Sequence, residues 1–466
     1  MLPEKFKQRL KSQKYIDTQA LLKALEEPSP VSIRINPLKW NKAPLPSDPV
    51  PWCKNGFYLG LRPSYTLDPL FHSGCYYPQE ASGMFLEQVV LQSSGSLENI
   101  RVLDLCGAPG GKSIHLSDLI GKESLLVANE VIRSRAAILA ETVTKWGSGN
   151  TLVTQNDPSS FGRFSGYFDI ILVDAPCSGE GMFRTNVAIN EWSTENSFHC
   201  SERQKRIIMD IWPALKENGI LIYSTCTFNP DENEKNIKWL IDRHEAECVR
   251  LNIADFRGIT EIDYDGIWGY GFYPGKIKGE GFFISVIRKT GRQEKASVNI
   301  RQKKEHRPSK NELAIIDNWT DFNTDRLLKW GEEILAVPCI MDDYLQLFRS
   351  FKILKAGTKI CVIKKQDYLP SHELALSQKL KKVAFPQVDI ELVDSLSFLR
   401  RDYFKLHNAS KGWNIVAYKG INLGFIKNLG NRINNYFPID WRIRMNIPDR
   451  VFENIIKWDN NDARIT

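Results

Sequence analysis

The sequence lacks several features that mark common protein classes. Its nine cysteines form no CxxC pair, so neither a zinc ribbon nor a thioredoxin-type redox motif is present, and we expect no metal site. No apolar stretch approaches the ~20 residues that a membrane span requires. The charged start, MLPEKFKQRL, has no apolar core of a secretory signal. These absences predict a cytoplasmic protein with free thiols and no membrane contact.

The composition is that of a folded protein of several domains. The chain has 466 residues, of which 42% are hydrophobic and 25% charged. A chain of this length usually divides into about three domains. The net charge of +7 mildly favours an anionic partner such as nucleic acid, although many enzymes of neutral substrates are equally basic.

Residues 100–227 alternate short β-branched runs with longer helical ones, a pattern typical of a parallel sheet. Strands are predicted at 101–106, 124–130, 151–156, 168–175, 219–226 and 281–289, and helices at 111–121, 133–146 and 200–217. The fold class is therefore α/β, with a doubly wound, Rossmann-like sheet. Ligands of such sheets bind beyond the carboxyl ends of the strands.

The flanking regions differ in composition from this central region. Before it, a proline-rich connector and the extended segment 31–39 indicate a small appended module. After it, residues 290–310 are basic and almost free of large apolar side chains, which is typical of a linker. Beyond residue 310 the runs SFLRRDYFK, WNIVAYKGINLGFIK and YFPIDWRIRM predict short strands.

The loop CGAPGGKS, Cys106 to Ser113, follows a predicted strand and opens a helix, where backbone N–H groups can meet a polar cofactor. A phosphate-binding P-loop would need glycine where Cys106 stands, and a dinucleotide GxGxxG does not fit the glycine spacing. A glycine-rich turn with Glu130 closing the second strand suits S-adenosylmethionine, whose ribose hydroxyls favour a carboxylate acceptor. The spacing alone is equally compatible with a tight turn and a solvated Glu130 in an unrelated α/β fold.

Two cysteines fall at the predicted carboxyl edge of the sheet. DAPCSGEGMFR begins at Asp174 and contains Cys177, and STCT contains Cys226. A thiolate there could add to an electron-poor ring carbon, and Asp174 could exchange a proton with a base. The alternative is that both cysteines are small core residues and Asp174 a loop cap.

DLCGAPGGKS, ANEVIRSR, DAPCSGEGMFR and STCTFNPDENE, in this order, resemble the Sun-type family of RNA cytosine-5 methyltransferases over residues 30–290. RINPLK (34–39) and YYPQEASGMF (76–85) are similar to that family's amino-terminal signatures. Residues 412–438 look like the PUA-like RNA-binding end of bacterial ribosomal RNA methyltransferases, a shorter match.

The resemblance implies S-adenosylmethionine as cofactor and assigns roles to particular residues. Cys226 matches the nucleophile, Cys177 the cysteine that assists product release, Asp174 an acid shared by cofactor and base, and Lys112 a lysine facing the base. The matched cofactor-binding residues are Cys106, Gly107, Ala108, Pro109, Gly110, Gly111, Lys112, Glu130, Arg135, Asp157 and Asp174. Spacing alone leaves open which cysteine attacks, because DNA cytosine methyltransferases use the cysteine of the PC motif.

The resemblance implies a monomeric RNA cytosine-5 methyltransferase acting on 16S ribosomal RNA or the small ribosomal subunit through a covalent cysteine adduct. The long tail favours ribosomal RNA, because structured RNA is bound over a broad surface. A transfer RNA enzyme, a P-loop hydrolase and a non-catalytic RNA-binding protein remain alternatives. The expected domains are an amino-terminal RNA-binding module (1–95), the methyltransferase domain (96–290), a basic linker (291–312), an intermediate domain (313–385) and a PUA-like domain (386–466).

Overall fold

The computed structural model describes residues 2–292, 307–321, 325–340 and 351–459, apart from residues 405, 407 and 449. Most of the predicted basic linker, residues 291–312, therefore lies outside the described residues. In the described ranges no helix has the length and apolar character needed to cross a membrane.

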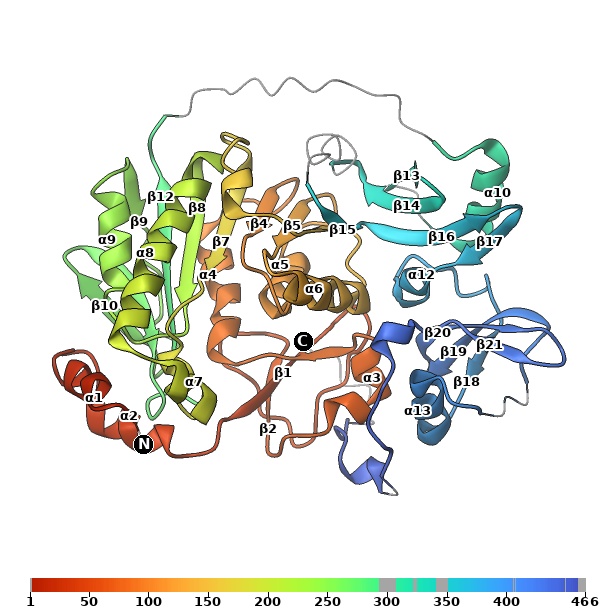
Figure 1. Cartoon of the computed structure of the whole chain (residues 1–466), viewed down its shortest axis with the longest axis horizontal. Coiled ribbons are helices and arrows are strands. Elements are labelled where there is room, and N and C mark those ends of the chain that lie inside the picture. The colour runs from red at the N-terminus through yellow and green to blue at the C-terminus, as the bar shows by residue number, and fades with distance from the viewer. Residues whose placement is uncertain are drawn as a thin grey trace.

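A large mixed sheet forms the centre of the molecule (Figure 1). Its five parallel strands lie in the order β6-β5-β4-β7-β8, as a doubly wound sheet requires. They are β4 (Arg101–Asp104), β5 (Leu125–Asn129), β6 (Thr151–Thr154), β7 (Phe168–Asp174) and β8 (Leu215–Thr225). The predicted Rossmann-like fold is confirmed.

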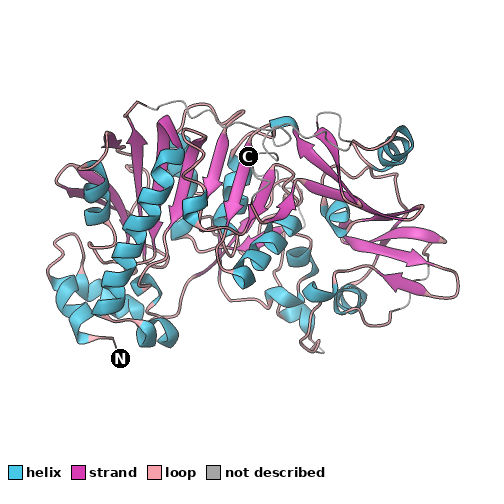
Figure 2. Cartoon of the chain, turned by 45° about the horizontal axis from the view of Figure 1, so that its top comes forward, coloured by secondary structure: helices cyan, strands magenta, loops and turns pink. Residues whose placement is uncertain are grey.

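Antiparallel strands extend this sheet at both edges, so that the strands form one continuous row (Figure 2). Beyond β8 lie β12 (Phe282–Lys289), predicted at 281–289, and then β11 (Ile267–Phe272) and β10 (Thr260–Tyr264), while β9 (Ala246–Cys248) also pairs with β12. At the opposite edge β15 (Ile353–Ala356), from the carboxyl-terminal third, pairs with β6. The carboxyl-terminal third is therefore joined to the catalytic sheet by backbone hydrogen bonds.

Successive residues of the parallel strands are buried on opposite faces of the sheet. Ile170 and Leu172 pack on the side of α4 (Leu86–Ser93), whereas Ile171 and Val173 pack with residues of α8 and α9. The other flanking helices are α5 (Gly111–Leu119), α6 (Arg133–Trp146), α7 (Asn186–Glu191), α8 (Thr194–Ile211) and α9 (Glu234–Ile241).

The predicted helix 200–217 is wrong at both ends. The observed helix α8 begins at Thr194, because the Ser193 side chain accepts a hydrogen bond from the Asn196 N–H at 2.9 Å. It ends at Ile211 because Pro213 cannot continue an α-helix, and β8 already begins at Leu215.

The amino-terminal residues form a separate three-stranded sheet with short helices. Its strands are β1 (Val31–Ile35), β2 (Gly56–Leu59) and β3 (Tyr76–Pro78), and α3 (Pro69–His72) shares its core. Helices α1 (Glu4–Lys11) and α2 (Thr18–Leu25) pack instead against Phe183, Phe228 and Tyr273. The extended segment predicted at 31–39 is thus confirmed as far as Ile35.

The carboxyl-terminal third carries two four-stranded sheets (Figure 1). The first has β13 (Asp325–Trp330), β14 (Glu333–Pro338), β16 (Thr358–Lys364) and β17 (Asp367–Pro370), and the second has β18 (Gln387–Asp389), β19 (Gly412–Tyr418), β20 (Ile421–Asn428) and β21 (Ile433–Asn435). The described helices here are α10 (Lys310–Trp319), α12 (His372–Leu376) and α13 (Leu392–Arg400).

The strands predicted in this third are only partly correct. WNIVAYKGINLGFIK forms the hairpin β19–β20, with Lys419 and Gly420 at positive φ in its turn. Residues 397–400 of SFLRRDYFK are instead the end of helix α13, in which Ser395, Leu396, Phe398 and Leu399 bury one helical face. YFPIDWRIRM contains only a short 3-10 turn at Ile439–Trp441, directly after Pro438.

One apolar core joins the two ends of the chain. Ile33 and Trp40 of the amino-terminal module share it with Phe437 and Trp458. The Trp40 and Trp458 ring centroids are 5.4 Å apart, and Pro44 forms a β-bridge with Trp458. The carboxyl-terminal third is therefore packed onto the amino-terminal module.

Replacing Trp458 with alanine is expected to destabilise the whole chain. Removing a buried tryptophan side chain costs about 3 kcal/mol or more, and Trp458 is buried in this shared core. Thermal unfolding followed by circular dichroism should show a lower midpoint for Trp458→Ala. The matched variant Trp330→Ala, at a ring 46% exposed, should change little, and equal effects would contradict the shared core.

Candidate active site

The carboxyl ends of four parallel strands bring most of the predicted residues to one edge of the sheet. The loop 106–110 follows β4, and Glu130 follows β5. Asp174 is the last residue of β7, with Cys177 three positions later, and Cys226 follows β8. Residues far apart in the sequence therefore meet where doubly wound sheets bind ligands.

Cys177 and Cys226 form a closely spaced pair of free thiols. Their sulfur atoms are 3.1 Å apart, and the Cys226 N–H donates to the Cys177 Sγ at 3.3 Å. The hydrogen bond with Cys226, together with burial, raises the pKa of Cys177 well above its usual range. Cys177 is therefore held as a protonated thiol beside Cys226.

Lys112 and Asp174 form a second pair beside the thiols. The Lys112 Nζ donates to the Asp174 Oδ2 at 2.8 Å, and the Ser224 hydroxyl donates to the Oδ1 at 2.7 Å. Burial lowers the pKa of Lys112, but the charges of Asp174 and of a Cys226 thiolate outweigh it and raise the pKa overall. Lys112 thus stays an ammonium ion that faces both Asp174 and Cys226.

The glycine-rich loop passes close to two neighbouring elements. A Cβ on Gly107 would lie 2.8 Å from the Ser113 Oγ, and a Cβ on Gly110, whose φ is +118°, would lie 2.7 Å from the Thr142 Cγ2. Burial raises the pKa of the Cys106 thiol, so this third cysteine of the edge is a poor nucleophile.

Two carboxylates border this loop. Asp104 is fully buried and accepts from the Ser113 hydroxyl through Oδ2 at 2.6 Å, while its Oδ1 has no hydrogen-bond partner. Glu130 accepts from the Ile132 N–H at 3.0 Å, and its Oε2 lies 3.4 Å from the Arg135 Nη2. The orphaned Asp104 oxygen and the buried Glu130 acceptor fit a ligand rich in N–H and O–H donors, as S-adenosylmethionine is.

The other two predicted cofactor-side residues differ in position. Arg135 donates to the Ala108 carbonyl at 2.9 Å, so it connects the glycine-rich loop with Glu130. Asp157 stands apart: it is exposed and accepts from the Ser159 N–H at 3.0 Å. The Ser159 side-chain hydrogen bond is the main cause that lowers the pKa of Asp157.

A buried acid behind the cysteine pair, Glu232, is not predicted by the motifs of the sequence. Glu232 accepts from the Ser178 N–H at 2.9 Å and from the Ser178 hydroxyl at 2.5 Å. Ser178 directly follows Cys177, and its hydroxyl lies 3.0 Å from that of Thr227, which directly follows Cys226. The signal for it in the sequence is the acidic run NPDENE after the TC motif, which by itself indicates no function.

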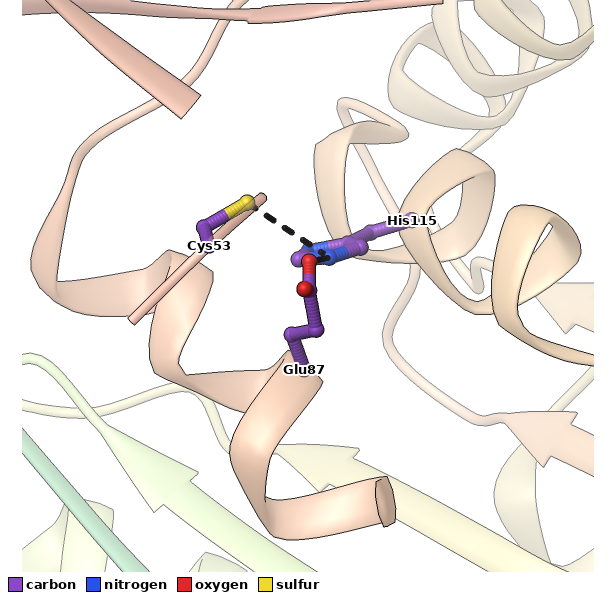
Figure 3. A group of neighbouring side chains, drawn as sticks. All are labelled: Cys53, Glu87 and His115. Atoms are coloured by element: carbon purple, nitrogen blue, oxygen red, sulfur yellow. Dashed lines mark hydrogen bonds and ion pairs between the residues drawn. The ribbon is translucent and has the colours of Figure 1, made fainter. Parts of the chain in front are cut away.

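Among the described residues, one group of three side chains could offer ligands to a metal ion (Figure 3). These are Cys53, Glu87 and His115, whose ligand atoms lie within 4.8 Å of one another. Hydrogen bonds already engage both Glu87 oxygens, from the His115 ring at 3.1 Å and from the Lys54 N–H at 3.1 Å. Burial lowers the pKa of His115, which keeps its imidazole neutral. The three side chains connect α5 with the amino-terminal module.

Three family models match the chain. Residues 94–288 match 16S rRNA methyltransferase RsmB/F, residues 2–81 match the N-terminal domain of 16S rRNA methyltransferase RsmF, and residues 385–443 match the methyltransferase RsmF PUA domain.

Curated relatives match over most of their length. The ribosomal RNA small subunit methyltransferase F of Shewanella piezotolerans is 30% identical over 438 residues, covering 88% of this chain and 90% of the relative. The protein of the same name from Klebsiella pneumoniae is 29% identical, and the match covers 89% of this chain and 91% of the relative.

Two solved structures from Pyrococcus horikoshii share the fold. A methyltransferase homolog protein has a TM-score of 0.52 and 28% identity, covering 62% of this chain and 95% of its own. NSun6, solved with SFG, has a TM-score of 0.51 and 20% identity, covering 62% of this chain and 99% of its own. At that lower identity the second likeness shows the fold alone.

The buried Asp104 is expected to make stability fall as pH rises. Burial raises its pKa from 3.8 to about 7. At a pH between these two pKa values, the folded state holds a proton that the unfolded state has lost. Replacing Asp104 with asparagine removes this dependence. The measurement is the melting temperature of Asp104→Asn minus that of the wild type, in the absence of cofactor. This difference should be several degrees more positive at pH 8 than at pH 5, on the usual scale of about 2–4 °C per kcal/mol.

The exposed variant Asp231→Asn serves as the control and should show the same offset from the wild type at both pH values. A constant offset for Asp104→Asn as well would mean that Asp104 is not protonated in the folded protein.

Proposed function

The chain belongs to the 16S ribosomal RNA methyltransferase RsmB/F family, and from this premise we propose that its target is a cytosine of 16S ribosomal RNA. The protein is an S-adenosylmethionine-dependent RNA cytosine-5 methyltransferase. The observation that carries the proposed mechanism is the pair of thiols, Cys177 and Cys226, with sulfur atoms 3.1 Å apart beside Lys112 and Asp174.

Cys226 is the proposed nucleophile. Carbon 5 of cytosine attacks a methyl group poorly, but addition of the Cys226 thiolate at carbon 6 pushes an electron pair toward carbon 5. Lys112, held charged by Asp174, faces Cys226 and offsets the charge of the attacking thiolate. Asp174 is proposed to lie near ring nitrogen 3 of the base, and the Lys112 ammonium paired with it offsets the negative charge that develops there on addition. The base reaches this edge unstacked from its neighbours.

S-adenosylmethionine supplies the methyl group. The residues proposed to hold it are those of the loop 106–112, with Glu130 on the ribose side, Arg135 at the cofactor edge and Asp157 on the adenine side. This assignment is supported by the close glycine approaches and the buried Glu130 carboxylate, while the exposed Asp157 supports it least.

Cys177 is proposed to serve the elimination that releases the product. Because it keeps its proton, it can donate that proton to the Cys226 sulfur as the carbon 6–sulfur bond breaks. The resulting Cys177 thiolate accepts the carbon 5 proton, and the electron pair of that bond restores the ring double bond. Both thiols end protonated, and the pair loses one proton to solvent before the next turnover.

The domain division is proposed as the sequence indicates it: an amino-terminal RNA-binding module at 1–95, catalysis at 96–290, a linker at 291–312, an intermediate domain at 313–385 and a PUA-like domain at 386–466. The three family matches, at 2–81, 94–288 and 385–443, support it. We further propose that the protein acts as a monomer in the cytoplasm, where free thiols are stable.

The substrate proposal is tested with purified protein and labelled S-adenosylmethionine. Unmodified 16S ribosomal RNA, assembled small subunits and total transfer RNA are offered in parallel, and bisulfite sequencing locates the modified cytosine. Label in 16S RNA or in the subunit is expected. Label only in transfer RNA would overturn the ribosomal target while leaving the chemistry intact.

The two cysteines should fail differently. Cys226→Ala removes the attacking thiol, so methyl transfer should be lost while RNA binding, which depends on other contacts, is retained. Cys177→Ala should permit attack and stall release, leaving RNA attached to protein in a denaturing gel. An adduct with Cys226→Ala and none with Cys177→Ala would mean that Cys177 attacks and Cys226 assists release.

Glu130→Ala is expected to weaken S-adenosylmethionine binding by roughly tenfold or more, because hydrogen bonds to a charged group contribute about 1.5–3 kcal/mol. Titration calorimetry measures this directly. The control Glu141→Ala removes a carboxylate that pairs with Lys145 on α6, and it should bind as the wild type does. Unchanged affinity in Glu130→Ala would remove Glu130 from the cofactor site.

A further inference from the structure

Glu232 is buried, and both of its carboxylate oxygens are used as acceptors. Oε2 accepts from the Ser178 N–H at 2.9 Å and from the Gln204 Nε2 at 3.1 Å. Oε1 accepts from the Ser178 hydroxyl at 2.5 Å and from the Asn229 Nδ2 at 3.3 Å. Burial is the main cause that raises the pKa of Glu232, while the hydrogen bonds from Ser178 and Gln204 act to lower it. Three of the four partners are N–H groups that can only donate, so both oxygens must accept and the arrangement fits the ionised carboxylate.

These bonds tie together the two loops that carry the cysteines. Ser178 follows Cys177 directly, and its hydroxyl also contacts that of Thr227, which follows Cys226. A series of hydrogen bonds through Ser178, with Glu232 at its buried end, therefore sets the separation of the two sulfurs. Burial keeps these hydrogen bonds formed, because breaking one would leave an unpaired donor in the protein interior at a cost in free energy.

Glu232 also places a negative charge behind one sulfur. It acts on Cys177 in the same direction as burial, raising the pKa of that thiol. The titratable groups that face Cys177 or the pair are Cys226 and Tyr223 on or after β8, Cys200 on α8, and Lys112, which pairs with Asp174 across the edge. Glu180 in the PC-motif loop interacts with Glu232 itself. Of the carboxylates in this set, Glu232 is the one bonded to the residue next to Cys177.

We propose that Glu232 is the positioning residue that gives the two cysteines different roles: it holds the Cys177 sulfur against Cys226 and keeps the shared proton on Cys177. This inference rests on the proposed function, in which one sulfur attacks and the other donates a proton. Glu232 itself touches neither cofactor nor base in this proposal.

The test follows alkylation of Cys177 by iodoacetamide as a function of pH, in the full chain without RNA, with peptide mass spectrometry reporting each cysteine separately. Glu232→Gln removes the charge and turns one acceptor into a donor. The pH midpoint of Cys177 alkylation should fall by about one pH unit, the lower end of the shift that a neighbouring charge produces. Glu232→Asp keeps the charge and should restore the midpoint toward that of the wild type.

The control is Glu234→Gln, a change at a second buried acid of the same segment, which bonds Tyr15. It should leave the Cys177 midpoint unchanged. An unchanged midpoint in folded Glu232→Gln, or an equal shift in Glu234→Gln, would overturn the proposal. Because no RNA or cofactor is present, this readout does not depend on whether 16S RNA proves to be the substrate.

A second variant keeps the proposal testable if Glu232→Gln does not fold. Ser178→Ala removes only the hydroxyl that links Glu232 to Thr227. Glutathione disulfide oxidises the two thiols to a disulfide and is itself reduced to two glutathione molecules, so the closure rate reports how well the sulfurs are held together. Closure should slow several-fold in Ser178→Ala, and a rate equal to the wild type would overturn the positioning role.

Discussion

The contact between the Cys177 and Cys226 sulfurs, 3.1 Å long, is the interaction on which the chemistry of this protein depends. The pairing of two parallel strands brings the two cysteine loops together, because the register of β7 and β8 sets Asp174 opposite Ser224. Each strand then turns into a loop that carries one cysteine. A shift of this register would separate the thiols and also break the Ser224 hydrogen bond to Asp174.

The amino-terminal module is coupled to the same site through helix α5. Arg34 pairs with Asp118 near the end of α5, and the Gln79 amide lies 3.4 Å from the ring nitrogen of His115. The first turn of that helix presents Lys112 to Asp174. The module therefore helps to fix the direction of α5, and with it the position of the ammonium group that faces Cys226. The module therefore has a structural role at the site, in addition to its proposed role in RNA binding.

The sequence predicted most of the sheet and the edge where its functional residues gather. The carboxyl ends of parallel strands lie together, so Glu130, Asp174, Cys177 and Cys226 could be placed at one edge from strand endings alone. Glu232 could not be found this way, because its importance comes from bonds to Ser178, which lies 54 positions away.

The carboxyl-terminal third was predicted less well, for a physical reason. The stretch 397–405 contains apolar residues that suit either a strand or a helix, and the buried face of α13 becomes visible only when residues from 392 onward are included. The pairing of β15 with β6 and the packing of Trp458 on Trp40 join segments hundreds of residues apart. Such contacts depend on tertiary packing and leave no local pattern.

Trapping on RNA that contains 5-fluorocytidine tests the covalent mechanism most directly. Fluorine at carbon 5 cannot leave as a proton does, so elimination is blocked after methyl transfer and the attacking sulfur stays bonded to carbon 6. Incubation of the wild-type protein with such RNA and S-adenosylmethionine, followed by peptide mass spectrometry, should show the nucleotide on Cys226. An adduct on Cys177, or methylation of normal RNA with no adduct on the fluorinated RNA, would contradict attack by Cys226.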